Sequence, residues 1–173
     1  ATSGNAGIGL AFMAACKGYK MVITLPEKMS NEKVSVLKSL GAEIIRTPTE
    51  CHTFDYDSHY MLARRIQKES ENAHILDQYA NPNNPGAHFR STGQEIFDQC
   101  GGKVDYIFIG AGTGGTITGV ARKMKQISPH TKVIGIDPYA SILAQPEELN
   151  ATTKTGYQVE GIGYDFIPES LDR

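Results

Sequence analysis

Short apolar runs alternate with amphipathic stretches along the chain, and this alternation is the feature that most limits its possible folds. The expected strands are residues 20–25, 43–47, 75–78, 106–109 and 133–136. The stretches between them carry apolar side chains at helical spacing. Such an alternation predicts an α/β architecture, with mainly parallel twisted sheets flanked by helices. The continuous apolar run 106–109 also predicts a strand that is buried on both faces.

Helix start and stop signals fall where this architecture needs them. The expected helices cover residues 8–15, 30–40, 58–68, 92–100 and 117–127. Gly18 and Gly41 suit left-handed caps after the first two helices. Ser30 is the expected N-cap of the second helix, and Met29 and Val34 have the spacing of a hydrophobic staple.

A cluster of turn-forming residues at 81–86 (NPNNPG) interrupts the pattern near the middle of the chain. The 173 residues, of which 40% are hydrophobic, suit one domain or two small lobes. We therefore expect one lobe at residues 1–80 and a second lobe at residues 81–173.

Composition excludes several classes of partner. The net charge of −2 gives no indication of a nucleic-acid or anionic-membrane partner, and no apolar run is long enough to span a bilayer. The cysteines (Cys16, Cys51 and Cys100) form no CxxC pair, and the histidines lack metal-ligand spacing. Cys16 and Cys100 occupy apolar helical positions, which predicts buried thiols in a reducing compartment such as the cytoplasm.

Residues 110–116 (GAGTGGT) join an expected buried strand to an amphipathic helix. Glycines let the backbone approach a ligand, and the first amides of a helix lack internal partners and favour an anion. Thr113 and Thr116 add hydroxyl donors. The pattern predicts a phosphate site.

Two phosphate ligands remain compatible with this loop. Gly110, Gly112 and Gly115 satisfy GxGxxG, and Asp137 ends the next strand, as in a dinucleotide-binding oxidoreductase domain. The threonine hydroxyls instead suit a terminal phosphate monoester. A second turn at residues 2–7 (TSGNAG) offers hydroxyls and helix amides to a carboxylate, and the pair of sites indicates an amino acid on a phosphorylated cofactor.

Several motifs resemble those of one enzyme family. TSGN (2–5) and GAGTGGTITG (110–119) are similar to motifs of fold-type II pyridoxal-phosphate enzymes, which include cysteine synthase. ILDQYANPNNPGAH (75–88) and EGIGYDFIP (160–168) resemble the cystathionine β-synthase branch in particular. The resemblance implies two lobes of the fold-type II architecture, here incomplete.

The resemblance also implies roles for individual residues. Asn5 would contact the phenolic oxygen of the pyridoxal ring, and Ser3 would help to stabilise the carbanion stage. The cofactor phosphate would be held by Gly112, Thr113, Gly114, Gly115 and Thr116. The amino-acid substrates would contact Thr2, Ser3, Gln78, Tyr79, Gly161, Gly163 and Tyr164.

The implied reaction is a β-replacement that condenses L-serine with homocysteine to give cystathionine. The alternatives are a cysteine synthase that uses O-acetylserine and sulfide, an NAD-binding oxidoreductase domain, and a non-catalytic fragment.

The family's Schiff-base lysine would precede Ala1, so we expect this chain to be inactive alone. Its haem-binding segment is also not represented. The resemblance also implies a homodimer or a higher oligomer, and Ala6 stands where the family usually has threonine.

Overall fold

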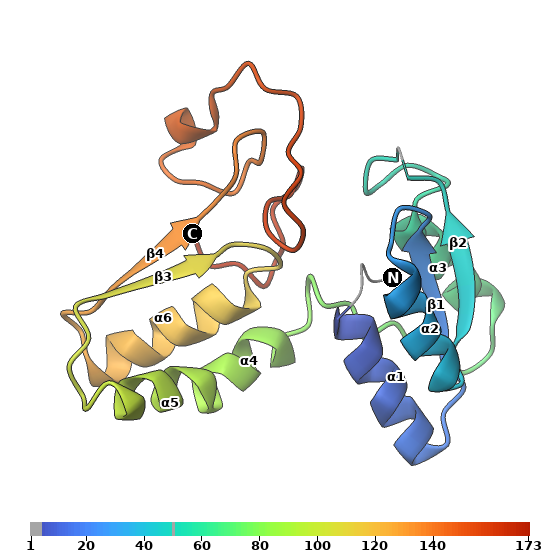
Figure 1. Cartoon of the computed structure of the whole chain (residues 1–173), viewed down its shortest axis with the longest axis horizontal. Coiled ribbons are helices and arrows are strands. Elements are labelled where there is room, and N and C mark those ends of the chain that lie inside the picture. The colour runs from blue at the N-terminus through green and yellow to red at the C-terminus, as the bar shows by residue number, and fades with distance from the viewer. Residues whose placement is uncertain (1–4, 50) are drawn as a thin grey trace. The chain divides into compact units, whose positions relative to one another are not determined.

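The computed structural model describes residues 5–49 and 51–173, and the chain divides into two compact units, Ala1–Leu76 and Asp77–Arg173. The first unit contains α1 (Asn5–Lys17), β1 (Val22–Pro26), α2 (Asn31–Ser39), β2 (Glu43–Thr47) and α3 (His59–Glu69) (Figure 1). The second contains α4 (Asn83–Arg90), α5 (Thr92–Gln99), β3 (Tyr106–Gly110), α6 (Gly115–Ile127), β4 (Lys132–Ile136) and the 3₁₀ helix η1 (Glu147–Asn150). The α/β class predicted from the sequence is confirmed. The compact second unit begins a few residues before the boundary that the turn cluster suggested.

The first unit is built around one parallel strand pair. β1 and β2 align with Ile23 opposite Ile44, and α2 connects them. Ile23, Leu25 and Leu37 form the centre of a buried apolar cluster. Met29 is buried in this cluster and Val34 packs against it, as the predicted staple requires, although the Ser30 side chain makes no capping hydrogen bond.

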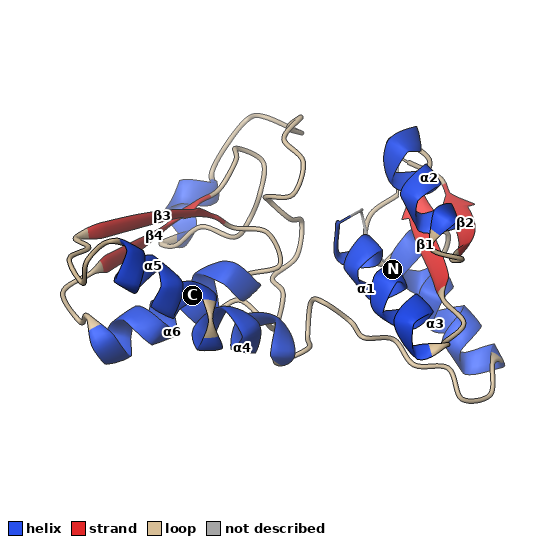
Figure 2. Cartoon of the chain, turned by 60° about the horizontal axis from the view of Figure 1, so that its bottom comes forward, coloured by secondary structure: helices blue, strands red, loops and turns tan. Residues whose placement is uncertain are grey.

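The second unit repeats the strand–helix–strand arrangement with β3, α6 and β4. The two strands are parallel, with Tyr106 opposite Lys132. Figures 1 and 2 place α4, α5 and α6 on the same side of these strands. The prediction that 106–109 is buried on both faces is therefore wrong. Tyr106 and Phe108 are 54% and 64% exposed, because all three helices cover the opposite face.

The sequence misplaced two elements near the middle of the chain. Residues 75–78 form no strand, because Asp77 uses its carbonyl and carboxylate to accept the amides of the following turn. The cluster at 81–86 was predicted only to interrupt the pattern of strands and helices, but α4 begins within it. Pro85 is tolerated there because a first-turn residue needs no amide hydrogen.

The prediction of buried thiols is also wrong, since Cys16 and Cys100 are both exposed. The buried residues of α1 are Gly7, Ala11 and Ala14, and Cys16 does not belong to that stripe. Cys100 lies at the C-cap of α5, just beyond the last helical turn. The positions of the two cysteines in the sequence fit the helical period, but they did not show which face of each helix packs against the core.

Truncation of Leu37 should destabilise the first unit. Leu37 is 1% exposed at the centre of the apolar cluster, so Leu37→Ala should lower the free energy of unfolding by about 2–4 kcal/mol. Val36, its neighbour in α2, is 43% exposed, and Val36→Ala should cost less than about 1 kcal/mol. Denaturant titrations of both variants provide the comparison. Equal losses would contradict this account of the core.

His59 should make the first unit sensitive to acid. Burial, aided by the positive charge of Lys28, lowers the pKa of His59 from 6.5 to about 4. The unfolded chain therefore binds a proton at this position more readily than the folded chain does, so stability should fall as the pH drops from about 6.5 to about 4. Proton NMR titration should give the midpoint, and His59→Gln should flatten the stability profile. A midpoint near 6.5 in the folded protein would refute this.

Candidate functional site

The segment between β3 and α6 forms a loop that leads into the N-terminus of a helix. We call residues 110–116 the glycine loop. The Gly163 amide donates to the Ala111 carbonyl at 2.8 Å, and the Ser170 hydroxyl donates to the Thr113 carbonyl at 2.6 Å. The Thr118 amide donates to the Gly114 carbonyl at 2.9 Å, as the first bond of the helix. These carbonyls are occupied, while the amides of the first helical turn at 115–117 have no intrahelical acceptor.

Close backbone packing explains why the loop needs glycine. A β-carbon on Gly112 would lie 2.4 Å from the Gly161 carbonyl oxygen, and one on Gly115 would lie 1.8 Å from Oδ1 of Asn84. Gly114 adopts a φ of 87°, which side-chain-bearing residues rarely adopt. The glycines therefore allow the segments around Asn84 and Gly161 to approach the main chain of the loop.

Both loop hydroxyls contact side chains of α4. Nδ2 of Asn84 donates to Oγ1 of Thr113 at 2.9 Å, which leaves the Thr113 proton available for a ligand. Oγ1 of Thr116 lies 3.2 Å from Nε2 of His88. Two hydroxyls and the amides of a helix N-terminus form a donor set that suits the oxygens of a phosphate monoester.

Two residues that the sequence did not single out connect the glycine loop to the predicted substrate pocket. Nδ2 of Asn84 also lies 2.7 Å from the Gln78 carbonyl. Ser170 donates its amide to the Tyr79 carbonyl at 2.9 Å and is 5% exposed. Asn84 lies in the turn-forming cluster at residues 81–86, which the sequence analysis assigned only to a boundary. Its side-chain amide was the feature that could have indicated a role in binding. Ser170 carries no recognisable pattern.

Tyr79 and Tyr164 lie together, and their predicted substrate contacts stay predictions. Their rings meet edge-on with centroids 5.5 Å apart, and Phe166 completes the cluster at 5.1 Å from Tyr79. Burial raises the pKa of Tyr79, and the neighbouring Tyr164 adds to the shift. Burial also raises the pKa of Tyr164. Both phenols therefore remain neutral near pH 7.

Gly161 and Gly163 lie beside the glycine loop, and their predicted contact with the cofactor stays a prediction. Their φ angles are 86° and 82°, so both occupy the left-handed region. A β-carbon on Gly163 would lie 2.6 Å from Cγ of Pro138 and 2.7 Å from the Tyr157 hydroxyl. These constraints hold the segment against Ala111 and, on its far side, against Ser141, whose hydroxyl accepts the Tyr164 amide at 3.0 Å.

Asp137, the residue that supported a dinucleotide site, is engaged within the protein. Its Oδ2 accepts the amides of Leu143 and Ala144 at 3.2 and 3.1 Å. Its Oδ1 is enclosed by the described residues. The carboxylate therefore organises the turn after β4 and is not directed at a ribose.

The remaining predicted contacts belong to the first unit. Asn5 is the first residue of α1 and is exposed, and Ala6 follows it on the same helix. Thr2 and Ser3 lie outside the described residues. The predicted roles of all of these residues stay predictions.

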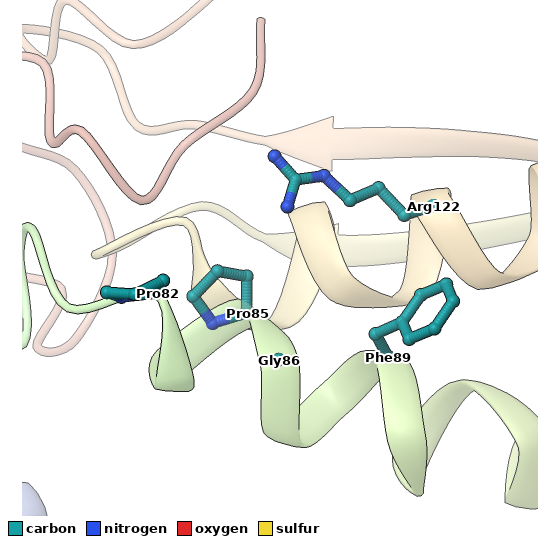
Figure 3. A pocket seen from close by; sticks show the side chains of 5 residues that line it. All are labelled: Pro82, Pro85, Gly86, Phe89 and Arg122. Carbon is teal, nitrogen blue, oxygen red and sulfur yellow. The ribbon is translucent and has the colours of Figure 1, made fainter.

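A separate pocket opens between α4 and α6 (Figure 3). It is lined by Pro82, Pro85, Gly86, Phe89 and Arg122. The guanidinium of Arg122 is engaged by the Asp172 carboxylate through contacts of 2.6 and 2.8 Å. The lining is mainly apolar and includes no residue of the glycine loop, so this pocket is distinct from the predicted phosphate site.

Residues 5–49 and 51–173 contain no group of His, Cys, Asp and Glu side chains that could hold a metal ion. Over the same residues, every helix is too short or too polar to cross a membrane.

Filling the space beside Gly112 should disrupt the loop. Gly112→Ala would force the Gly161 carbonyl to move, and we expect a loss of about 2 kcal/mol in unfolding free energy together with weaker anion binding. A β-carbon on Gly156 would meet no atom within 4 Å, so Gly156→Ala is the matched control and should change neither property. Thermal unfolding and phosphate titration measure both. A fully stable Gly112→Ala protein would contradict the packing argument.

Comparison with known proteins agrees with this geometry. A family model described as "Pyridoxal-phosphate dependent enzyme" matches residues 1–173. The chain is 62% identical to "Cystathionine beta-synthase" of Dictyostelium discoideum over 99% of its length, and 60% identical to that of Rattus norvegicus. It covers 34% and 31% of those proteins, about a third of their length. "Cysteine synthase 3" of Caenorhabditis elegans is 38% identical over 99% of this chain and 49% of its own. The chain belongs to the family of pyridoxal-phosphate dependent enzymes.

Proposed function

We propose that this chain forms part of the catalytic core of an enzyme that condenses L-serine with homocysteine to give cystathionine. The observation that carries the proposal is the glycine loop, whose helix N-terminus and two threonine hydroxyls are linked through Asn84 and Ser170 to the segment of Gln78 and Tyr79. The higher identity to cystathionine beta-synthases than to a cysteine synthase supports this choice of substrates.

The loop residues would hold the phosphate of pyridoxal phosphate. The residues are Gly112, Thr113, Gly114, Gly115 and Thr116. They fit the group because the carbonyls of Ala111, Thr113 and Gly114 accept hydrogen bonds within the protein. The first amides of α6, in contrast, lack intrahelical acceptors. Asn5 would contact the phenolic oxygen of the ring. When bound, the cofactor supplies an electron sink for chemistry at the amino-acid α-carbon.

Other residues would orient the amino-acid substrates. Thr2 and Ser3 would bind the substrate carboxylate, and Gln78 and Tyr79 would line the pocket. Because burial keeps Tyr79 and Tyr164 protonated, their hydroxyl groups would offer uncharged polar contacts in an apolar wall. Gly161 and Gly163 would close one side of this wall without side chains.

A dinucleotide ligand is disfavoured by the geometry. Asp137 uses Oδ2 to accept two main-chain amides, and its other oxygen is enclosed. The family resemblance further leads us to propose a homodimer in the cytoplasm, with no nucleic-acid or membrane partner.

Substrate specificity can be tested with protein expressed from its complete gene. Product formation from serine plus homocysteine should exceed that from O-acetylserine plus sulfide, as followed by mass spectrometry. The opposite preference would favour a cysteine synthase. No turnover of either pair, despite bound cofactor, would favour the non-catalytic alternative.

Cofactor binding should depend on the Thr113 hydroxyl. Removal of a hydrogen bond to a charged group costs about 1.5–3 kcal/mol, so Thr113→Val should raise the dissociation constant of pyridoxal phosphate at least about tenfold. Thr152 is exposed and lies outside the site, and Thr152→Val is the control. Equilibrium dialysis measures the constants. Equal binding by both variants would exclude Thr113 as a phosphate ligand.

A further inference from the structure

His88 lies between two threonine hydroxyl groups, one of which belongs to the glycine loop. Its Nε2 is 3.2 Å from Oγ1 of Thr116, and its Nδ1 is 3.0 Å from Oγ1 of Thr92. The three residues come from α4, α5 and α6. The imidazole ring therefore links the start of α6, where an anion would bind, to the start of α5.

Close helix packing fixes this arrangement. A β-carbon on Gly119 would lie 2.3 Å from the Pro85 carbonyl oxygen and 2.6 Å from Cβ of His88. Any side chain at position 119 would push α4 away from α6. Gly119 thus permits the approach that brings the ring of His88 to Thr116.

Counting hydrogens leaves two consistent arrangements for a neutral ring. A hydroxyl group and a neutral imidazole each carry one polar hydrogen. With hydrogen on Nε2, the ring donates to Thr116 and accepts from Thr92. With hydrogen on Nδ1, the ring donates to Thr92 and Thr116 must donate to Nε2. Only the first arrangement leaves the Thr116 proton free to point at a ligand.

A phosphate dianion distinguishes between these arrangements. It offers only acceptor oxygens, so it is stabilised by a hydroxyl that donates and repelled by one that presents a lone pair. Burial lowers the pKa of His88, which favours the neutral ring to which this choice applies. The ring is half-buried, and its side-chain partners are the two hydroxyls.

We propose that His88 is a positioning residue that fixes the Thr116 hydroxyl as a donor to the cofactor phosphate, and that Thr92 selects the required tautomer of the ring. The Thr92 hydroxyl donates to Nδ1, Nε2–H donates to Oγ1 of Thr116, and Thr116 donates to the phosphate. This inference rests on the proposed function, because it takes the glycine loop as the phosphate site.

The tautomer can be observed directly by NMR. Protein labelled with ¹⁵N-histidine should show His88 as the Nε2–H tautomer when inorganic phosphate or pyridoxal phosphate is added near neutral pH. Thr92→Val, which removes the donor to Nδ1, should increase the Nδ1–H share. Ser91→Ala is the matched control, because the Ser91 hydroxyl donates to the Ala87 carbonyl and does not contact the ring. A dominant Nδ1–H tautomer in the phosphate-bound wild-type protein would overturn the proposal.

Binding measurements give a second, independent readout. His88→Gln keeps an N–H donor for Thr116 and should retain phosphate affinity within about twofold, whereas His88→Leu should weaken it by about tenfold. The ³¹P NMR signal of inorganic phosphate reports both constants. Wild-type phosphate affinity in His88→Leu would refute the proposed role of His88 but would leave the phosphate site itself unaffected. Failure of the wild-type protein to bind either phosphate or pyridoxal phosphate would instead refute the proposed function. The wild-type tautomer measurement needs no substitution, so it stays decisive if His88→Leu fails to fold.

Discussion

Close contact between the glycine loop and three distant segments of chain is the constraint on which the second unit depends. Gly112, Gly114 and Gly115 face the backbone of Gly161, the backbone of Leu171 and the side chain of Asn84. Each contact is shorter than a β-carbon would allow. The irregular C-terminal segment can therefore pack against the strand–helix unit without a sheet of its own.

The same contacts decide which ligand the loop can bind. Its carbonyl groups accept hydrogen bonds from Gly163, Ser170 and Thr118, while donors remain at the start of α6. A loop with exposed carbonyls would suit a cation, whereas exposed amides and hydroxyls suit an anion. No acidic side chain lies within residues 110–116, and the carboxylate of Asp137 is engaged in a turn. The way in which the protein uses its own acceptors thus supports the proposal of an anion ligand.

The residues around the glycine loop are held together by hydrogen bonds and include an uncharged aromatic cluster. Asn84 and Ser170 each reach both the loop and the segment at 78–79, so these two segments cannot move independently. The Tyr79, Tyr164 and Phe166 rings pack edge-on or tilted beside them. Since burial keeps both phenols neutral, the aromatic cluster adds no charge that would compete with the phosphate or with a substrate carboxylate.

The sequence by itself determined the α/β class, most elements and the position of the glycine loop between a strand and a helix. These depend on local periodicity, on caps and on the glycine pattern of residues 110–116, which short-range physics sets. Tertiary structure decided what depends on distant packing. It placed α4, α5 and α6 on one face of β3 and β4 and left Phe108 exposed. It also gave Asn84, His88 and Ser170 their contacts with the loop, because a side chain's partners across the fold have no signature in its local sequence.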